Sequence, residues 1–362
     1  MIPTPIDLPK VQRWSRNFEG STHLVFAGGF EDVCGAFLDY LPARKASSVS
    51  GALAIRYLPF IDRNETHLNL LYDKLAQRGF GRDVVVERVF DRMDPHDSVP
   101  QITEYFESLP SDTQLCVDIS GMSRLLLLVV LNAAMRRRIP LTIVSAVAKT
   151  YEPSAQKYEA AAAAFQQGSV RPEFLCREIS KTIALPEFGG MHDVAFPTAL
   201  VAFAEFNYKR LAKIVADGHF ADVVQIVPVP SDPADAWRVN AIRAINRDLI
   251  TAPTRTLELP ADEYVETLAH LEALYRDLRY SHNITVAALG TKLQTVACWL
   301  LHAAHPEIQI VFTAPVHFEV DLYTRGVSDF LSVDWTQVTA IERATEMLKN
   351  PARAEFIRLT QN

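Results

Sequence analysis

The sequence predicts an α/β protein made of two consecutive doubly wound parallel sheets, with further helices near the C-terminal end. Short, nearly continuous apolar runs alternate with amphipathic stretches of about 10–15 residues, which is typical of parallel strands covered by helices on both faces. The same order of runs and stretches occurs twice along the chain. The 362 residues are 49% hydrophobic, which is enough apolar surface for two cores.

The two halves of the chain share a series of strand-like and helix-like segments. Thr22–Asp32 opens with an apolar run and breaks into a turn, and Thr198–Tyr208 does the same, with partner segments about 170 residues apart throughout. The other paired segments are Leu53–Pro59 with Val224–Pro230, Asp83–Phe90 with Thr254–Leu259, Val99–Leu109 with Tyr264–Leu278, Cys116–Arg124 with Val286–Lys292, and Leu141–Ala146 with Ile308–Ala314. The pattern indicates two tandem Rossmann-like repeats formed by duplication. The alternative is that any two α/β domains resemble each other to this degree.

We expect the chain to divide at residue 190, into a first repeat over 1-190 and a second repeat over 191-362. Each repeat is followed by a further strand-like segment, Phe174–Ile183 in the first and Arg325–Trp335 in the second. Thr336–Lys349 and Arg353–Leu359 are expected to close the chain as helices.

Composition and charge argue against several classes of protein. No apolar stretch approaches the roughly 20 residues needed to span a bilayer, and the N-terminal segment MIPTPIDLPK lacks the pattern of a secretion signal. The net charge of −7 does not favour a general electrostatic interaction with nucleic acid. The four cysteines, Cys34, Cys116, Cys176 and Cys298, are far apart and lie in apolar contexts. We therefore expect a cytoplasmic protein with reduced thiols.

Two strand-to-helix junctions have the composition of an anion-binding site. Gly290, Thr291 and Lys292 follow an apolar run and begin a helical pattern, and the segment Ser120–Arg124 repeats this chemistry with one more residue between glycine and hydroxyl. The start of a helix presents free backbone N–H groups, a glycine permits close approach, and a Lys or Arg adds a full charge. The alternative is that Thr291 and Ser123 only cap their helices. A cation in the first turn opposes the helix dipole, which favours an external anion.

The junction of strand, Gly-Thr-Lys and helix resembles the signature of CRISPR-associated Rossmann-fold (CARF) sensor domains. Two such units in one chain resemble the SAVED arrangement of two fused CARF-like units. Gly290, Thr291 and Lys292 match the motif, and Ser120, Gly121, Ser123 and Arg124 match it conservatively. The resemblance implies binding of cyclic oligonucleotide second messengers in prokaryotic antiviral defence. Such sensors normally carry an effector, and none is evident here. The resemblance therefore implies a sensor or accessory subunit that acts through a partner protein or through self-association.

Further residues are candidates for ligand contacts. Gly28 and Gly29 follow the first strand and are expected at the same sheet edge as Ser120. Tyr323 and Arg325 are an aromatic and a guanidinium in one loop, which suits a base and a phosphate; the alternative is a surface loop that carries both without a ligand. Glu31 and Asp32 suit ribose hydroxyls or the cap of the next helix.

An enzyme is the alternative function. Asp118 or Glu31 at a strand end would serve as the general base of a Rossmann-like enzyme acting on a nucleotide or phosphorylated metabolite. The Gly-x-Ser-x-Gly, phosphate-loop and Gly-x-Gly-x-x-Gly motifs are absent from the sequence. His302-x-x-His305 has no third ligand nearby, so neither a metal site nor a cofactor is predicted. A third hypothesis is a scaffold subunit of a complex, in which the repeats only bury each other.

Overall fold

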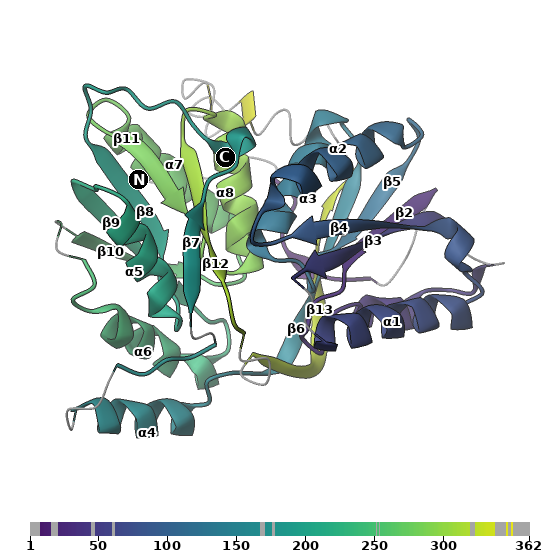
Figure 1. Ribbon diagram of the computed structural model, residues 1–362, viewed down its shortest axis with the longest axis horizontal. Coiled ribbons are helices and arrows are strands. Elements are labelled where there is room, and N and C mark those ends of the chain that lie inside the picture. Colours follow the sequence, from purple (N-terminus) through teal and green to yellow (C-terminus); the bar gives the residue numbers. More distant parts are fainter. Residues whose placement is uncertain are drawn as a thin grey trace, which may run out of the picture. The chain divides into compact units, whose positions relative to one another are not determined.

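The computed structural model describes residues 8–15, 21–44, 48–59, 62–166, 171–175, 178–250, 252, 254–318, 323–336, 345–346 and 349. The chain forms two compact units (Figure 1). The N-terminal unit consists of Pro9–Tyr151 and a strand from near the end of the chain, Thr324–Trp335, and the C-terminal unit is built on Glu152–Tyr323. Within the described ranges, no helix combines the length and the apolar character needed to cross a membrane.

The N-terminal unit contains a seven-stranded sheet with the order β1-β13-β6-β5-β2-β3-β4. Its strands are β1 (Gln12–Arg13), β2 (Thr22–Ala27), β3 (Val49–Leu58), β4 (Val85–Asp91), β5 (Gln114–Asp118), β6 (Leu141–Tyr151) and β13 (Thr324–Trp335). Strands β2 to β6 are parallel, whereas β13 runs antiparallel to β6 and β1 antiparallel to β13. Every residue of the central strand β2 is buried, because helices cover both faces of the sheet.

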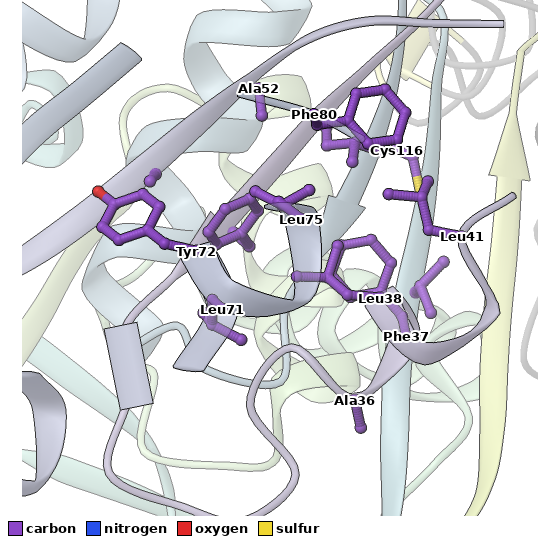
Figure 2. Packing of buried hydrophobic residues seen from close by; sticks show 14 of the residues in the cluster. Ala36, Phe37, Leu38, Leu41, Ala52, Leu71, Tyr72, Leu75, Phe80 and Cys116 are labelled. Atoms are coloured by element: carbon purple, nitrogen blue, oxygen red, sulfur yellow. The ribbon is translucent and has the colours of Figure 1, made fainter. Parts of the chain in front are cut away.

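Helices pack on both faces of this sheet. They are η1 (Ala36–Tyr40), α1 (Asp62–Gln77), η3 (Arg82–Val84), η4 (Pro95–Asp97), α2 (Ser98–Ser108) and α3 (Arg124–Arg136). On one face, η1 and α1 bury an apolar cluster that includes Phe37 and Leu71 (Figure 2). On the other face, Tyr105 of α2 reaches His23 of β2, and α3 packs beside α2. Burial lowers the pKa of His23 to about 4, so the buried ring is neutral at pH 7.

The C-terminal unit contains a six-stranded sheet with the order β10-β9-β8-β11-β12-β7. Its strands are β7 (Ile179–Ile183), β8 (Thr198–Phe203), β9 (Asp222–Val229), β10 (Thr254–Pro260), β11 (Asn283–Ala287) and β12 (Gln309–Pro315). All are parallel except β7, which runs antiparallel to β12. The helices are α4 (Ala155–Gln166), η5 (Pro186–Phe188), α5 (Tyr208–Asp217), η6 (Pro233–Asp235), α6 (Trp237–Asn246), α7 (Tyr264–Leu278) and α8 (Lys292–Ala304).

The two sheets share one topology, and the predicted class of two Rossmann-like α/β repeats is confirmed. Strands β4-β3-β2-β5-β6-β13 of the first sheet follow the same order as β10-β9-β8-β11-β12-β7 of the second. In both sheets the sixth strand of this series is antiparallel. The helix predicted over Tyr264–Leu278 has those bounds as α7. The helices predicted over Thr336–Lys349 and Arg353–Leu359 lie outside the described residues, apart from a few positions in the first.

The antiparallel strands are exchanged between the halves of the chain. Strand β7 follows the first five parallel strands in sequence but pairs with β12 of the second sheet, and β13 follows β12 but pairs with β6 of the first sheet. The two units therefore differ from the expected division into 1-190 and 191-362. The chain passes from one unit to the other after Tyr151 and again after Tyr323.

A fragment that ends at residue 190 is expected not to fold cooperatively. It lacks β13, so β6 keeps β5 but loses its antiparallel partner along its whole length, and the core loses the buried side chains of Phe330, Val333 and Trp335. Thermal unfolding followed by circular dichroism tests this. A matched fragment in which residues 9–151 are linked to 324–336 is expected to melt cooperatively, and the reverse result would contradict the strand exchange.

Candidate functional site

In each unit, the candidate site lies where the strand order reverses. The chain proceeds from β2 outward to β3 and β4, then returns to β5 on the other side of β2, and the C-terminal unit does the same with β8 and β11. The loops that follow these neighbouring parallel strands leave the same sheet edge in opposite directions. Ligands of doubly wound proteins bind at such a point.

In the N-terminal unit, two glycines bring the loops after β2 and β5 into backbone contact. A Cβ atom on Gly29 would lie 2.6 Å from Sγ of Cys34 and 2.9 Å from the carbonyl oxygen of Gly121. A Cβ atom on Gly121 would collide with the carbonyl oxygen of Ala27. Both positions therefore require glycine for close packing. Gly29 and Gly121 were predicted to bind a ligand, and this packing explains the two glycines without one.

Tyr57, near the end of β3, holds the second of these loops. Its hydroxyl donates to the carbonyl oxygen of Gly121 at 3.2 Å and accepts from the backbone N–H of Ser123 at 2.6 Å. Burial raises the pKa of this phenol, so the hydroxyl keeps the proton that it donates. Tyr57 thereby sets the conformation of the loop immediately before α3.

Asp118 and Ser120 bind backbone groups of their own unit. One carboxylate oxygen of Asp118 accepts from the N–H of Gly35 at 3.0 Å and the other from the N–H of Ser120 at 2.9 Å, and the side chain is buried. The hydroxyl of Ser120 accepts from the N–H of Ala146 at 2.8 Å. These contacts order the turn after β5.

The loop after β2 also contacts the exchanged strand β13 and helix α1. The hydroxyl of Thr324 donates to the carboxylate of Glu31, and Asp32 pairs with Arg63 at 3.0 Å. Nδ1 of His67 lies 3.0 Å from the carbonyl oxygen of Gly29, and burial is the main cause of the lowered pKa of this imidazole. Glu31 and Asp32 thus connect the loop to other elements of the unit.

In the C-terminal unit, Gly290 is required by its neighbours. A Cβ atom at this position would lie 2.6 Å from Oε1 of Gln294 and 2.7 Å from the ring of Phe203. Phe203 is the last residue of β8, so Gly290 brings the loop after β11 against the end of β8. The neighbours of Gly290 are side chains, whereas Gly29 and Gly121 also meet the backbone of the facing loop.

A capping box begins α8. The N–H of Gln294 donates to the hydroxyl of Thr291 at 3.1 Å, and the N–H of Thr291 donates to the side chain of Gln294 at 3.0 Å. The hydroxyl of Thr291 also donates to the carbonyl oxygen of Ala261, and Nε2 of Gln294 donates to that of Pro260 at 2.9 Å. The start of α8 is therefore attached to the end of β10.

The two junctions place the same chemical groups at the same helix positions. Ser123 and Thr291 are the N-cap residues of α3 and α8, and each accepts from the third N–H of its helix. Arg124 and Lys292 are the first residues of these helices, and both are half-buried. The N-terminal unit has one more residue, Met122, between the glycine and the hydroxyl residue of its junction. Met122 is buried, and the cap and the cation keep the same helix positions.

The remaining predicted residues are Arg325, Tyr323 and Gly28. Arg325 is an exposed residue of β13 opposite Thr150, in the N-terminal unit. Tyr323 belongs to the C-terminal unit, where its carbonyl oxygen accepts from the N–H of Glu152 at 2.7 Å and its ring lies 6.1 Å from that of Phe318. Gly28 packs against Leu68 of α1.

The histidines of the His302-x-x-His305 pattern are both buried and bound within the C-terminal unit. The two ring nitrogens of His302 lie 2.9 Å and 3.0 Å from the carbonyl oxygens of Ile308 and Glu187. Nε2 of His305 lies 2.7 Å from the carboxylate of Glu272. These contacts give both histidines structural partners at the end of α8.

Sequence reasoning missed Tyr57, Phe203 and Gln294. The spacing Thr291-x-x-Gln294 is the sequence signature of a capping box and was available in the sequence. Tyr57 and Phe203 had no such signal, because their contacts depend on strands that meet only in the folded sheet.

The substitution Gly290→Ala is expected to destabilise the protein by about 1–3 kcal/mol, because the added methyl group overlaps Phe203 and Gln294. Chemical denaturation measures the change. Gly189→Ala is the matched control, since its nearest neighbour would be 3.4 Å away and its φ is −71°. Equal stability of the two variants would contradict the close approach at Gly290.

The substitution Tyr57→Phe is expected to cost about 1–3 kcal/mol, because the N–H of Ser123 and the carbonyl oxygen of Gly121 lose a buried partner. Tyr280→Phe, at a residue 78% exposed, serves as the control. An unchanged midpoint of urea unfolding for Tyr57→Phe would show that the hydroxyl does not hold this loop.

No protein-family model and no curated protein matches the sequence. Among solved structures, the chain is similar to a Type III CRISPR defence DNA nuclease activated by cyclic oligoadenylate, with 10% identity and a TM-score of 0.48 over 77% of this chain. The match spans 63% of the nuclease chain. It is also similar to the cytoplasmic domain of a prokaryotic cation chloride cotransporter, with 6% identity and a TM-score of 0.24 over 84% of this chain and 100% of that chain.

Proposed function

We propose that the chain binds a nucleotide-type second messenger at its two strand-to-helix junctions. One observation carries this proposal. In both units, a hydroxyl N-cap and a cation at the first helix position, Ser123–Arg124 and Thr291–Lys292, follow the strand beside the point where the strand order reverses. Such a repeat of position and chemistry is expected if both junctions bind phosphate groups of one class of ligand.

The physical basis is the start of a helix. The first N–H groups of α3 and α8 point out of the helix and carry the positive end of its dipole, which attracts phosphate. A Lys or Arg at the first position opposes that dipole in the unliganded protein but adds to the attraction for an anion. A phosphate at either junction would be attracted both by the helix start and by the charge of Arg124 or Lys292.

The contacts of the candidate catalytic carboxylates favour binding over catalysis. Asp118 is buried and accepts from two backbone N–H groups, and Glu31 accepts from Thr324. A general base needs an oxygen within reach of the proton that it removes. Both carboxylates instead order the loops, so a Rossmann-like enzyme acting on a nucleotide or phosphorylated metabolite is the weaker alternative.

The proposed ligand class is a cyclic oligonucleotide, and the proposed setting is antiviral defence in the prokaryotic cytoplasm. This part of the proposal rests on the resemblance of Gly290-Thr291-Lys292 to the sensor motif. The binding signal would pass to a partner protein or to a second copy of the chain.

Lys292→Ala is expected to weaken the binding of a cyclic oligonucleotide about tenfold or more, because a charge-assisted hydrogen bond to phosphate is lost. The stability of the ligand-free protein should not fall, because a cation is removed from the positive end of α8. A thermal-shift series with mono-, di- and cyclic nucleotides, including a cyclic oligoadenylate, measures both effects. A ligand at a hundred times its Kd stabilises the folded protein by about 2.7 kcal/mol.

Lys213→Ala is the matched control, since it removes the same charge from α5, where Lys213 pairs with Asp217. The double variant of Arg124 and Lys292 should abolish the nucleotide response. A Lys292→Ala variant that melts early without ligand would show that Lys292 is structural. Turnover of a bound nucleotide would favour the enzyme, and no response to any nucleotide would favour the scaffold.

A further inference from the structure

Asn64 is a buried carboxamide in the first turn of α1. Its side chain is 5% exposed, and within the described part of the chain Oδ1 has no hydrogen-bond partner. A buried polar atom without a partner destabilises the folded protein. The sequence motifs predicted for ligand binding do not include this residue.

The position of Asn64 directs it to the same sheet edge as the candidate site. Asn64 lies on the buried stripe of α1 together with Leu68, Leu71 and Leu75. A Cβ atom on Gly28 would lie 3.0 Å from Cβ of Leu68 and 3.4 Å from the backbone oxygen of Asn64. Asn64 is one turn closer to the helix start than Leu68, and its backbone lies beside the loop that follows β2. Helical side chains point toward the N-terminal end of their helix, which directs the amide of Asn64 toward this edge of the sheet.

The charges around Asn64 are engaged in ion pairs and do not leave an excess of positive charge. Glu65 pairs with Arg56, and Arg63 of the same turn pairs with Asp32. This turn therefore offers no spare cation for a second phosphate, whereas the cation of this unit's junction is Arg124 on α3. An unpaired carboxamide oxygen is an acceptor and needs an N–H or O–H donor from the ligand.

We propose that Oδ1 of Asn64 accepts a hydrogen bond from the exocyclic amino group of a nucleobase bound at the N-terminal unit. This inference rests on the proposed nucleotide function and identifies the ligand as an amino-bearing base. Arg124 then binds phosphate and Asn64 selects the base. Because Oδ1 is buried without ligand, the base reaches it only when the first turn of α1 moves away from Gly28.

The test compares a cyclic oligoadenylate with the same ring in which every adenine is deaminated to hypoxanthine. The substitution replaces the donating amino group by an accepting carbonyl, which would face Oδ1 as a second acceptor. We expect calorimetry to give at least about tenfold tighter binding of the adenylate ring, as for other base contacts of an amide side chain. Hydrogen exchange of residues 62–68 is expected to change on binding.

Asn64→Leu separates selection from stability. This variant removes the unpaired oxygen, so the melting temperature of the ligand-free protein should stay the same or rise, while the preference between the two rings disappears. Asn246→Leu is the matched control. Asn246 also has an unpaired buried Oδ1, but its Nδ2 donates to the carbonyl oxygens of Glu205 and Ile242, so this variant should melt earlier and keep the preference.

The outcomes separate this inference from the proposed function. Equal affinity of the native protein for both rings overturns the role of Asn64 and leaves nucleotide binding intact. A lower melting temperature of ligand-free Asn64→Leu overturns it as well, because Asn64 would then be structural. Binding of neither ring, nor of any mono- or dinucleotide, refutes the proposed function itself. Arg124→Ala is expected to weaken the binding of both rings equally and to keep the preference between them. This result would support the assignment of phosphate binding to Arg124 and base selection to Asn64.

Discussion

The exchange of one antiparallel strand between the two halves of the chain is the constraint on which the remaining structure depends. Strand β13 pairs with β6 from Tyr151 to Leu141, and β7 pairs with β12 in the other sheet. Without these strands, β6 and β12 would be sheet edges with unpaired backbone groups. Neither half of the sequence completes its own sheet. Each unit therefore contains strands from both halves of the chain.

The exchanged strand also reaches the candidate site of the N-terminal unit. Thr324 at the start of β13 binds Glu31 in the loop after β2, and Gly29 of that loop packs against Gly121 in the loop after β5. The conformation of the junction before α3 therefore depends on β13, because Thr324 of β13 binds Glu31, which lies 293 residues earlier in the chain. In the C-terminal unit, the capping box of α8 and its bonds to Pro260 and Ala261 have the corresponding role. Both arrangements fix the conformation of a helix start, which would lower the entropic cost of binding the anion proposed for it.

Much of the fold and part of the site could be predicted from local pattern. Apolar runs at a repeated spacing identified the parallel strands, since a strand buried on both faces has no polar alternation. The hydroxyl caps before Arg124 and Lys292 could be predicted because capping involves only residues three apart. The same local logic placed Asp118 at the end of its strand. It gave no information on the N–H group of Gly35, from which the carboxylate also accepts, because Gly35 lies 83 residues away.

The sequence by itself determined the class of the fold, the order of its strands and helices, and the cationic first residues of α3 and α8, because each depends on short-range periodicity and helix-end chemistry. Only the tertiary structure decided which sheet receives β7 and β13, because either sheet offers an antiparallel edge of the same kind. It also decided the surroundings of Tyr57, Phe203 and Asn64. Their surroundings are formed by elements distant in sequence, and burial changes the energy of an unpaired or hydrogen-bonded polar group far more than residue type alone.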